Sequence, residues 1–427
     1  MSELPPHDSF RDHLPDLGAS RFVAMQKQDA HEYAAAFLRT RNPPELYALY
    51  QHWRKLLAEP FKGITNDGSV RHGLFEIEDE GAPIDGIVAA ARAAVDKMDP
   101  SQRKRSFYHV DSHEWRTWSN PEFLLSDKGI RLDEVGPELR EAVMAVLRAT
   151  LSPEGYAQAV GAMRINGFLG DLVSAPAVMN EASYNFVLFG AEPSAAEPWG
   201  FSLYGHHLSI NAFFYRRQMV LSPCFFGAEP NFIDAGPHAG TRILADQEAL
   251  GLALMQSLPD GAAARARVYR RLRDPAMPRG RWNPDDQRHM CGAYRDNRIV
   301  PYEGVLVSSL GAEQQELAAA VVACHLAYLP EGPRCRRLAA VRSWFHETFF
   351  CWIGDADDDA AFYYRIQSPV IVIEFDHHSG VFLTNSEPAK FHIHSLVRTP
   401  NGGDYGMALR QLIPGACEDF EWEKSHE

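Results

Sequence analysis

Two histidines separated by one residue, His392 and His394, stand near the C-terminal end of the sequence. They lie in the run Phe391–Arg398, whose β-branched and aromatic residues favour a strand. Alternate residues of a strand share one face, so His392, His394 and Arg398 point to a common side. Imidazole nitrogens are suitable ligands for zinc, iron or manganese, and an arginine can clamp a substrate carboxylate.

A carboxylate occupies an unusual position shortly before these histidines. Glu374 lies inside the apolar run Val370–Asp376 and shares a strand face with Asp376. Burying an unpaired carboxylate is costly, so Glu374 needs a metal ion, a cation or several hydrogen-bond donors. If the two runs pair as a hairpin with its tip around 378–389, Glu374 could lie beside His392 and His394.

The run Gly205–Asn211 is a second source of polar side chains on an expected strand. Strict alternation places His207, Ser209 and Asn211 on one face and His206 on the other. We therefore expect His207 to face a polar pocket and His206 to be packed beside it.

These residues define one candidate site, completed by two segments rich in turn residues. Glu229, restrained by Pro230, could be a general base, or a turn carboxylate satisfied by backbone N–H groups. Tyr405, within Asp404–Gly406, belongs to a segment that could orient Arg398 or cap a final helix. The expected metal ligands are His207, Glu374, His392 and His394; the expected catalytic residues are Glu229, Asp376 and Arg398; the expected substrate contacts are Ser209, Asn211, Arg365 and Tyr405.

This set of residues favours a metal-dependent enzyme acting on a small organic molecule, with zinc or iron as its divalent cofactor. In a hydrolytic version, the ion lowers the pKa of bound water and Glu229 or Asp376 takes the proton. In an oxidative version, two histidines and one carboxylate hold ferrous iron. We favour hydrolysis slightly, because the sequence contains no separate redox-cofactor motif.

Two metal-free interpretations remain open. In the first, Glu374 pairs with Arg365 or Arg398 in a buried ion network, and the histidines are simply hydrogen-bonded. In the second, the arginines and histidines bind an anionic small molecule without turnover. Nucleotide-dependent enzymes and serine hydrolases are disfavoured, because the sequence lacks the glycine-rich phosphate loops, the Gly-x-Ser-x-Gly elbow and the His-Glu-x-x-His helix.

The elements that must position these residues follow no regular βαβ alternation, which favours an α+β fold with a mostly antiparallel sheet core flanked by helices. We expect a helical N-terminal arm (1–58), a domain over 59–415 built as one unit or two subdomains, and a C-terminal tail (416–427). The expected helices cover 29–41, 45–56, 87–98, 139–147, a segment capped by Ser152, 244–258 and 317–328. The expected strands lie within 73–78, 184–189, 200–211, 218–221, 349–353, 362–376 and 391–398. Residues 275–286 are expected to form a surface loop or lid.

The overall composition limits the classes of molecule that the protein is expected to bind. The 427 residues are 45% hydrophobic and 23% charged, as in ordinary globular proteins. The net charge of −14 disfavours sequence-independent binding to nucleic acid. The six cysteines form no Cys-x-x-Cys pair, and no secretory leader or membrane-spanning run is visible. We therefore expect a cytoplasmic protein with a small-molecule substrate and no nucleic-acid or membrane partner; the oligomeric state stays open.

The segments quoted above resemble the family catalogued as domain of unknown function 3500. The resemblance extends from about Phe61 to about Leu412 and leaves the N-terminal arm out. It implies that the polar strand-face residues mark the site, and it brings no established reaction, cofactor or ligand set. The matching segments are Gly63–Thr65, Asp67-Gly68, Trp199-Gly200, Gly205–Ser209 with Asn211, Pro223–Pro230, Tyr364–Ile366, Ile373–Phe375, and His392–His394 followed by Arg398, Pro400, Asp404, Tyr405 and Gly406.

Overall fold

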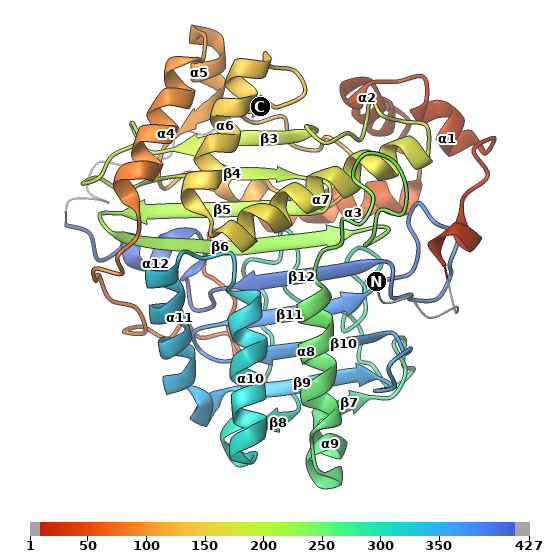
Figure 1. The fold of residues 1–427 in the computed structure, drawn as a ribbon, viewed down its shortest axis with the longest axis vertical. Coiled ribbons are helices and arrows are strands. Elements are labelled where there is room, and N and C mark those ends of the chain that lie inside the picture. Colours follow the sequence, from red (N-terminus) through yellow and green to blue (C-terminus); the bar gives the residue numbers. More distant parts are fainter. Residues whose placement is uncertain (1–8, 415–427) are drawn as a thin grey trace.

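A single twelve-stranded sheet forms the centre of the protein in a computed structural model that describes residues 9–414 (Figure 1). Its main path runs β1-β3-β4-β5-β6-β12-β11-β10-β9-β7, with β2 beside β3 and β8 beside β9. Only the β1–β3 and β7–β9 pairs are parallel among the described strands, which confirms the expected α+β class. The strands are β1 (Phe107–Tyr108), β2 (Ile130–Arg131), β3 (Tyr184–Phe189), β4 (Trp199–Gly205), β5 (Leu208–Tyr215), β6 (Gln218–Ala228), β7 (Arg267–Tyr269), β8 (Val305–Leu306), β9 (Phe349–Gly354), β10 (Phe362–Gln367), β11 (Val372–His377) and β12 (Ile393–Arg398).

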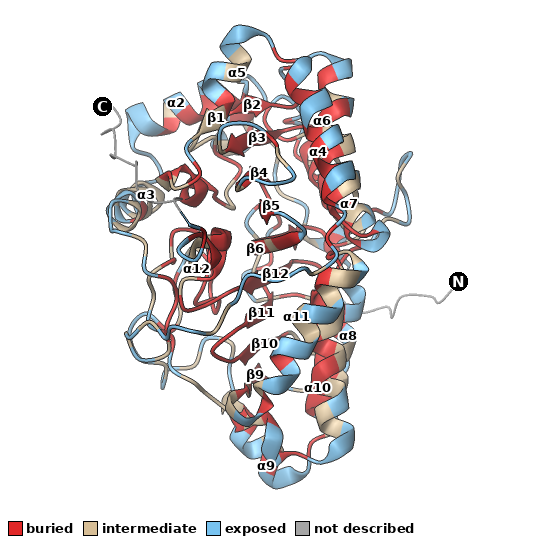
Figure 2. Cartoon of the chain, turned by 90° about the vertical axis from the view of Figure 1, so that its left-hand side faces the viewer, coloured by how far each residue is buried: buried red, intermediate tan, exposed pale blue. Residues whose placement is uncertain are grey.

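Helices cover the two faces of this sheet differently (Figure 2). The long helices α4, α6, α7, α8, α10 and α11 cover one face, whereas α2, α3 and α12 lie on the opposite side with long connecting segments. None of the helices in 9–414 has the length and apolar character needed to cross a membrane. The α-helices are α1 (Ser20–Met25), α2 (Ala30–Thr40), α3 (Pro44–Leu57), α4 (Ile84–Asp96), α5 (Pro100–Ser106), α6 (Pro137–Thr150), α7 (Pro153–Leu172), α8 (Ala245–Gln256), α9 (Asp260–Ala266), α10 (Ala312–His325), α11 (Glu331–Ser343) and α12 (Met407–Arg410).

The sheet consists of two sets of strands that meet in its middle. Strands β3–β6 follow one another in the sequence and pair with their neighbours, and β9–β12 do the same. The two sets are joined by the antiparallel pair β6–β12, where Gly227 lies opposite His394. The main hydrophobic core lies between the sheet and the long helices, so side chains on the other face are free to form a polar site.

Most of the expected helices are present with the expected capping. Asp29 caps α2 in a capping box with Glu32, and the hydroxyl of Ser152 accepts the N–H of Gly155 at the start of α7. These local signals need no tertiary information, which explains why the helical N-terminal segment is readable from sequence. The expected tail, 416–427, lies outside the described residues.

Three strand predictions are wrong in detail. Residues 73–78 form no strand and are mostly exposed; they are tethered by the Gln218 side chain, which bonds the backbone of Glu76 and Glu78. The expected single run 200–211 is two strands joined by a turn at His206-His207, and 362–376 is likewise two strands. Apolar alternation continues across such short turns, so periodicity alone does not reveal them.

Candidate metal centre

Three of the four expected metal ligands converge. His207, His392 and His394 are buried, and each offers one ring nitrogen within 4.8 Å of the others. We call these residues the first triad. His394 lies on β12 and His392 just before it, whereas His207 is the second residue of the β4–β5 turn.

The backbone around His207 is specialised for this approach. His207 has φ 61°, an unusual value for a residue other than glycine, and its carbonyl accepts the Gly227 N–H at 2.8 Å. A Cβ on Gly227 would lie 2.8 Å from Cδ2 of both His207 and His394. A glycine is therefore required here for the two imidazoles to come together.

The His392–His394 pair has the spacing expected of two ligands to one ion. His392 Nδ1 lies 2.8 Å from the Ser379 carbonyl oxygen, which can only accept, so Nδ1 carries the proton and Nε2 the lone pair. That Nε2 lies 3.2 Å from His394 Nε2. Two nitrogens bound to a tetrahedral zinc ion are about 3.3 Å apart, given Zn–N distances of about 2.0–2.1 Å. The Ser379 carbonyl also fixes the ring in the way that second-shell acceptors commonly do.

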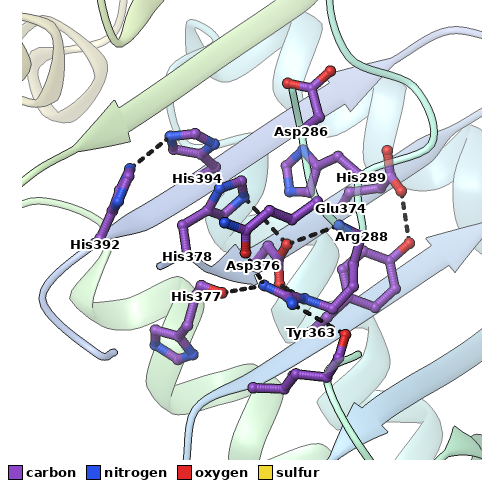
Figure 3. A network of polar contacts seen from close by, with 12 residues as sticks. Asp286, Arg288, His289, Tyr363, Glu374, Asp376, His377, His378, His392 and His394 are labelled. Atoms are coloured by element: carbon purple, nitrogen blue, oxygen red, sulfur yellow. Dashed lines mark hydrogen bonds and ion pairs between the residues drawn. The ribbon is translucent and has the colours of Figure 1, made fainter. Parts of the chain in front are cut away.

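A second group of candidate ligands adjoins the first (Figure 3). His289, Asp376 and His378 are buried, and one ligand atom from each lies within 4.8 Å of the others; we call them the second triad. His378 Nε2 is 3.2 Å from Asp376 Oδ2, and Arg288 Nε donates to Asp376 Oδ1 at 2.6 Å. Both ring nitrogens of His289 are buried and have no hydrogen-bond partner among residues 9–414.

The two triads form one continuous cluster. The ring centroids of His378 and His394 are 3.9 Å apart, and those of His378 and His392 are 5.2 Å apart. Asp376 on β11 lies opposite His394 on β12. Five imidazoles and one carboxylate thus lie side by side on the face of the sheet opposite the long helices.

Burial keeps these imidazoles neutral. It lowers the pKa of His207, His378 and His394 well below the usual value, and the neighbouring histidines add to this effect. The pKa values of His289 and His392 are also lowered by burial, although nearby carboxylates oppose the shift. Because a metal ligand must be a neutral imidazole, protons compete little for these nitrogens near neutral pH.

A cavity of about 550 Å³ opens beside the cluster. Its inner wall includes His207, His378, His392 and His394, and its outer wall includes residues of α1, α2 and α3. Asp286 lines it as well, and burial raises the pKa of this carboxyl well above the usual value. A substrate in this cavity would contact the first triad directly.

Glu374, the fourth expected ligand, lies elsewhere. The hairpin forms as expected, but Glu374 lies opposite Leu396, so Asp376 takes the place beside the histidines. Glu374 instead accepts the N–H groups of Met290 and Cys291, both at 2.8 Å, and the hydroxyl of Tyr363 at 2.6 Å. Burial raises its pKa, but His289, Arg365 and these hydrogen bonds outweigh burial, so the pKa is lowered overall. Glu374 therefore positions the segment that carries His289.

Glu229 has a similar anchoring role. Its Oε1 accepts the N–H groups of Val381, Phe382 and Leu383 at 2.8–3.0 Å, as in the backbone-satisfied alternative. Its Oε1 is also 3.8 Å from His392 Nδ1, but Glu229 does not line the cavity. It therefore fixes the loop between His378 and His392.

The expected arginine and tyrosine contacts belong to a separate buried network. Arg398 Nη1 pairs with Asp296 at 2.7 Å and Asp404 at 3.0 Å, and its other N–H groups bond the carbonyls of residues 291 and 292. Tyr405 donates to Asp296 at 2.9 Å. In a neighbouring pair, Arg365 bonds Glu303 at 2.8 Å. Arg398, Arg365 and Tyr405 therefore pair with protein groups, and none of the three lines the cavity.

Ser209 and Asn211 hold the sheet together. Asn211 accepts from Ser202 at 2.8 Å and donates to Ser209 Oγ and to the Pro223 carbonyl. Both residues are fully buried and neither lines the cavity, so the structure does not bring them together with the triads.

His206 and the second triad complete the comparison with the sequence. His206 Nδ1 lies 2.9 Å from Asn166 Oδ1, and its ring stacks on His207 at 3.9 Å, a packed position beside the ligand. Sequence reasoning missed His378 and His289 as ligands. His378 could have been found from the adjacent pair His377-His378 after the Glu374 strand, but His289 lies in a loop without periodicity.

A family model described as a protein of unknown function, DUF3500, matches residues 80–407. The chain belongs to this family. The match is narrower than the expected range of about 61 to 412, but it contains all six residues of the two triads. Helices α1–α3 precede the region shared with DUF3500. No curated protein and no solved structure is significantly similar to this DUF3500 chain.

Proposed function

We propose that this DUF3500 protein is a metal-dependent enzyme that acts on a small organic molecule at the two triads. The observation that carries the proposal is the buried cluster of five imidazoles and one carboxylate, of which His207, His378, His392 and His394 line a cavity. Without an ion, several of its nitrogens are buried and unpaired, which costs free energy at each of them. Divalent ions would bind one nitrogen of each ring, and the donor set suits zinc or iron.

The first triad supports hydrolysis. Three histidines with an adjoining cavity resemble catalytic zinc sites, which keep one position open. An ion there would lower the pKa of a bound water and polarise a substrate carbonyl or phosphoryl group. If only this triad is loaded, Asp376 would accept the proton, because it lies opposite His394 and is held by Arg288. If both are loaded, Asp376 becomes a ligand of the second ion.

The second triad supports an oxidative alternative. Two histidines and one carboxylate are the donors of many non-heme iron enzymes, and this composition occurs in His289, Asp376 and His378. Metal identity separates the two reactions: zinc favours hydrolysis and iron favours oxygen chemistry. The metal-free alternative for an anionic ligand is weaker, because Arg365 and Arg398 already pair with protein carboxylates.

The deciding experiment is metal analysis of protein purified without an affinity tag. We expect at least one stoichiometric transition metal, and a lower unfolding temperature after chelation. His392→Ala and His394→Ala should each abolish metal retention at the first triad. The matched control is His325→Ala, which removes a buried histidine that bonds Tyr364 and Ser395 on the other face of the sheet. Wild-type protein that contains no metal and is insensitive to chelator would contradict the proposal.

A further inference from the structure

We propose that the substrate is an uncharged, mainly apolar organic molecule, and that helices α1–α3 select it by forming the outer wall of the cavity. This inference rests on the proposed function, because the reacting group would lie at the triads. Beyond the proposed function, it specifies the chemical class of the substrate and the segment of the chain that recognises the part of the substrate away from the reacting group.

The outer wall is mainly apolar where α2 and α3 form it. Ala36 and Phe37 of α2 and Leu46, Leu49 and Trp53 of α3 line the cavity. Leu46, Leu49 and Ala36 are only half-buried, so part of their apolar surface is available to a ligand. Covering such surface with a ligand stabilises the complex through the hydrophobic effect.

The charged side chains of the cavity argue against an anionic substrate body. Arg21, the only basic side chain among the described lining residues apart from the histidines, pairs with Glu122 at 3.1 Å. Asp285 pairs with Arg295 at 3.0 Å. The third carboxyl group in the lining belongs to Asp286, which cannot attract an anion. The described lining of the cavity therefore offers no unpaired Lys or Arg, and two of its three carboxyl groups, those of Glu122 and Asp285, are already paired. An uncharged ligand body fits this wall best.

The volume of the cavity and the segments that line it support a role of α1–α3 in substrate selection. A volume of about 550 Å³ lies within the roughly 300–1,000 Å³ typical of small-molecule sites. The six triad residues lie inside the region shared with DUF3500, whereas α1–α3 precede it. Reaction chemistry and substrate choice are thus assigned to different parts of the chain.

The test uses two hydroxamic acids that share a metal-binding head, acetohydroxamate and octanohydroxamate, titrated into cobalt-loaded protein. We expect octanohydroxamate to bind at least tenfold more tightly, because its longer chain covers the apolar wall. Ala36→Phe should weaken octanohydroxamate binding at least tenfold and change acetohydroxamate binding less than twofold. The control is Ala35→Phe, on the same helix but exposed and outside the cavity.

A second variant guards against a folding defect in Ala36→Phe. Leu46→Ala removes wall surface instead of adding bulk, and it should also weaken octanohydroxamate binding selectively, by about fivefold or more. Equal affinity of the two hydroxamates, or equal effects of the Ala35 and Ala36 variants, would overturn the inference and leave the metal centre intact.

A protein that binds no metal would defeat the proposed function, but the wall can still be tested. In that case 1-octanol is titrated into the metal-free protein by calorimetry. Binding that is lost in Ala36→Phe and retained in Ala35→Phe supports the apolar wall. Absence of octanol binding to the wild type overturns it.

Discussion

Asp376 on β11 lies directly opposite His394 on β12, and the two residues belong to different triads. One pair of neighbouring strands therefore brings the two candidate metal sites side by side. Sites this close can act on one substrate, since paired metal ions commonly clamp the attacking and leaving groups of a displacement.

The two triads should be separable by mutation. We expect up to two ions per chain in the wild type. His289→Ala should leave the first triad loaded, and His207→Ala should leave the second loaded, because neither residue belongs to the other triad. Metal analysis after dialysis measures both; loss of all metal from His289→Ala would contradict two separable sites.

Gly227→Ala should damage the first triad. The added methyl group would crowd the rings of His207 and His394, so we expect at least tenfold weaker metal binding and roughly 1–3 kcal/mol lower stability. Metal titration and urea unfolding check both effects. Gly86→Ala is the control: its Cβ would meet no atom within 4 Å in the exposed part of α4, and alanine there should raise stability slightly.

Glu374→Gln should act by loosening the segment that carries His289, because Glu374 itself is not one of the triad ligands. An amide can replace only part of the acceptor capacity that Met290, Cys291 and Tyr363 use, so we expect a loss of roughly 1–3 kcal/mol in unfolding free energy. Metal at the second triad should weaken, because its segment loosens, while the first triad stays loaded. If the first triad loses its metal and the second keeps it, Glu374 is not the anchor described above.

Glu229→Ala should free the loop that follows His378. Three backbone N–H groups, those of residues 381–383, would lose their acceptor at once. We expect much faster amide hydrogen exchange at these residues, with little change in β9 or β10. Unchanged exchange at 381–383 would show that other contacts hold the loop.

Glu80 should make stability depend on pH. Burial raises the pKa of this carboxyl from 4.5 to about 7, although the Met219 N–H and the Gln218 amide donate to it. A raised pKa means that the folded state holds the proton more tightly than the unfolded state. This contribution to stability is therefore complete below about pH 4.5 and is lost as pH rises through 7. Glu80→Gln should be roughly 1–3 kcal/mol more stable than wild type at pH 8 and nearly equal at pH 5 in denaturant unfolding.

The strand faces of the site are predictable from sequence, but the register is not. Alternation correctly places His394 of β12 on the same side as His392, which lies just before this strand, and Glu374 with Asp376 on one face of β11. Which carboxylate meets the histidines depends on the length and path of the connection between the strands, and sequence patterns do not specify this path. The result is a shift of two residues, from Glu374 to Asp376.

Candidate metal ligands that lie in loops and turns are still harder to predict from sequence. His289 reaches the cluster because Glu374 binds the two backbone N–H groups that follow it, a contact between residues far apart in the sequence. His207 was identified from strand alternation but reaches the cluster from a turn with φ 61°. Local patterns locate the polar residues, whereas long-range hydrogen bonds decide which of them converge.

The pairing of β6 with β12 has a consequence for how the protein matures. His207 comes from the set of strands that is synthesised early, and His392 and His394 come from the last strand of the set that is synthesised late. The first triad is complete only after the chain has been synthesised as far as His394. Metal scarcity in a cell is thus expected to lower the amount of protein that survives proteolysis, because chains lacking the ion lose a link between the early and late parts of the sheet.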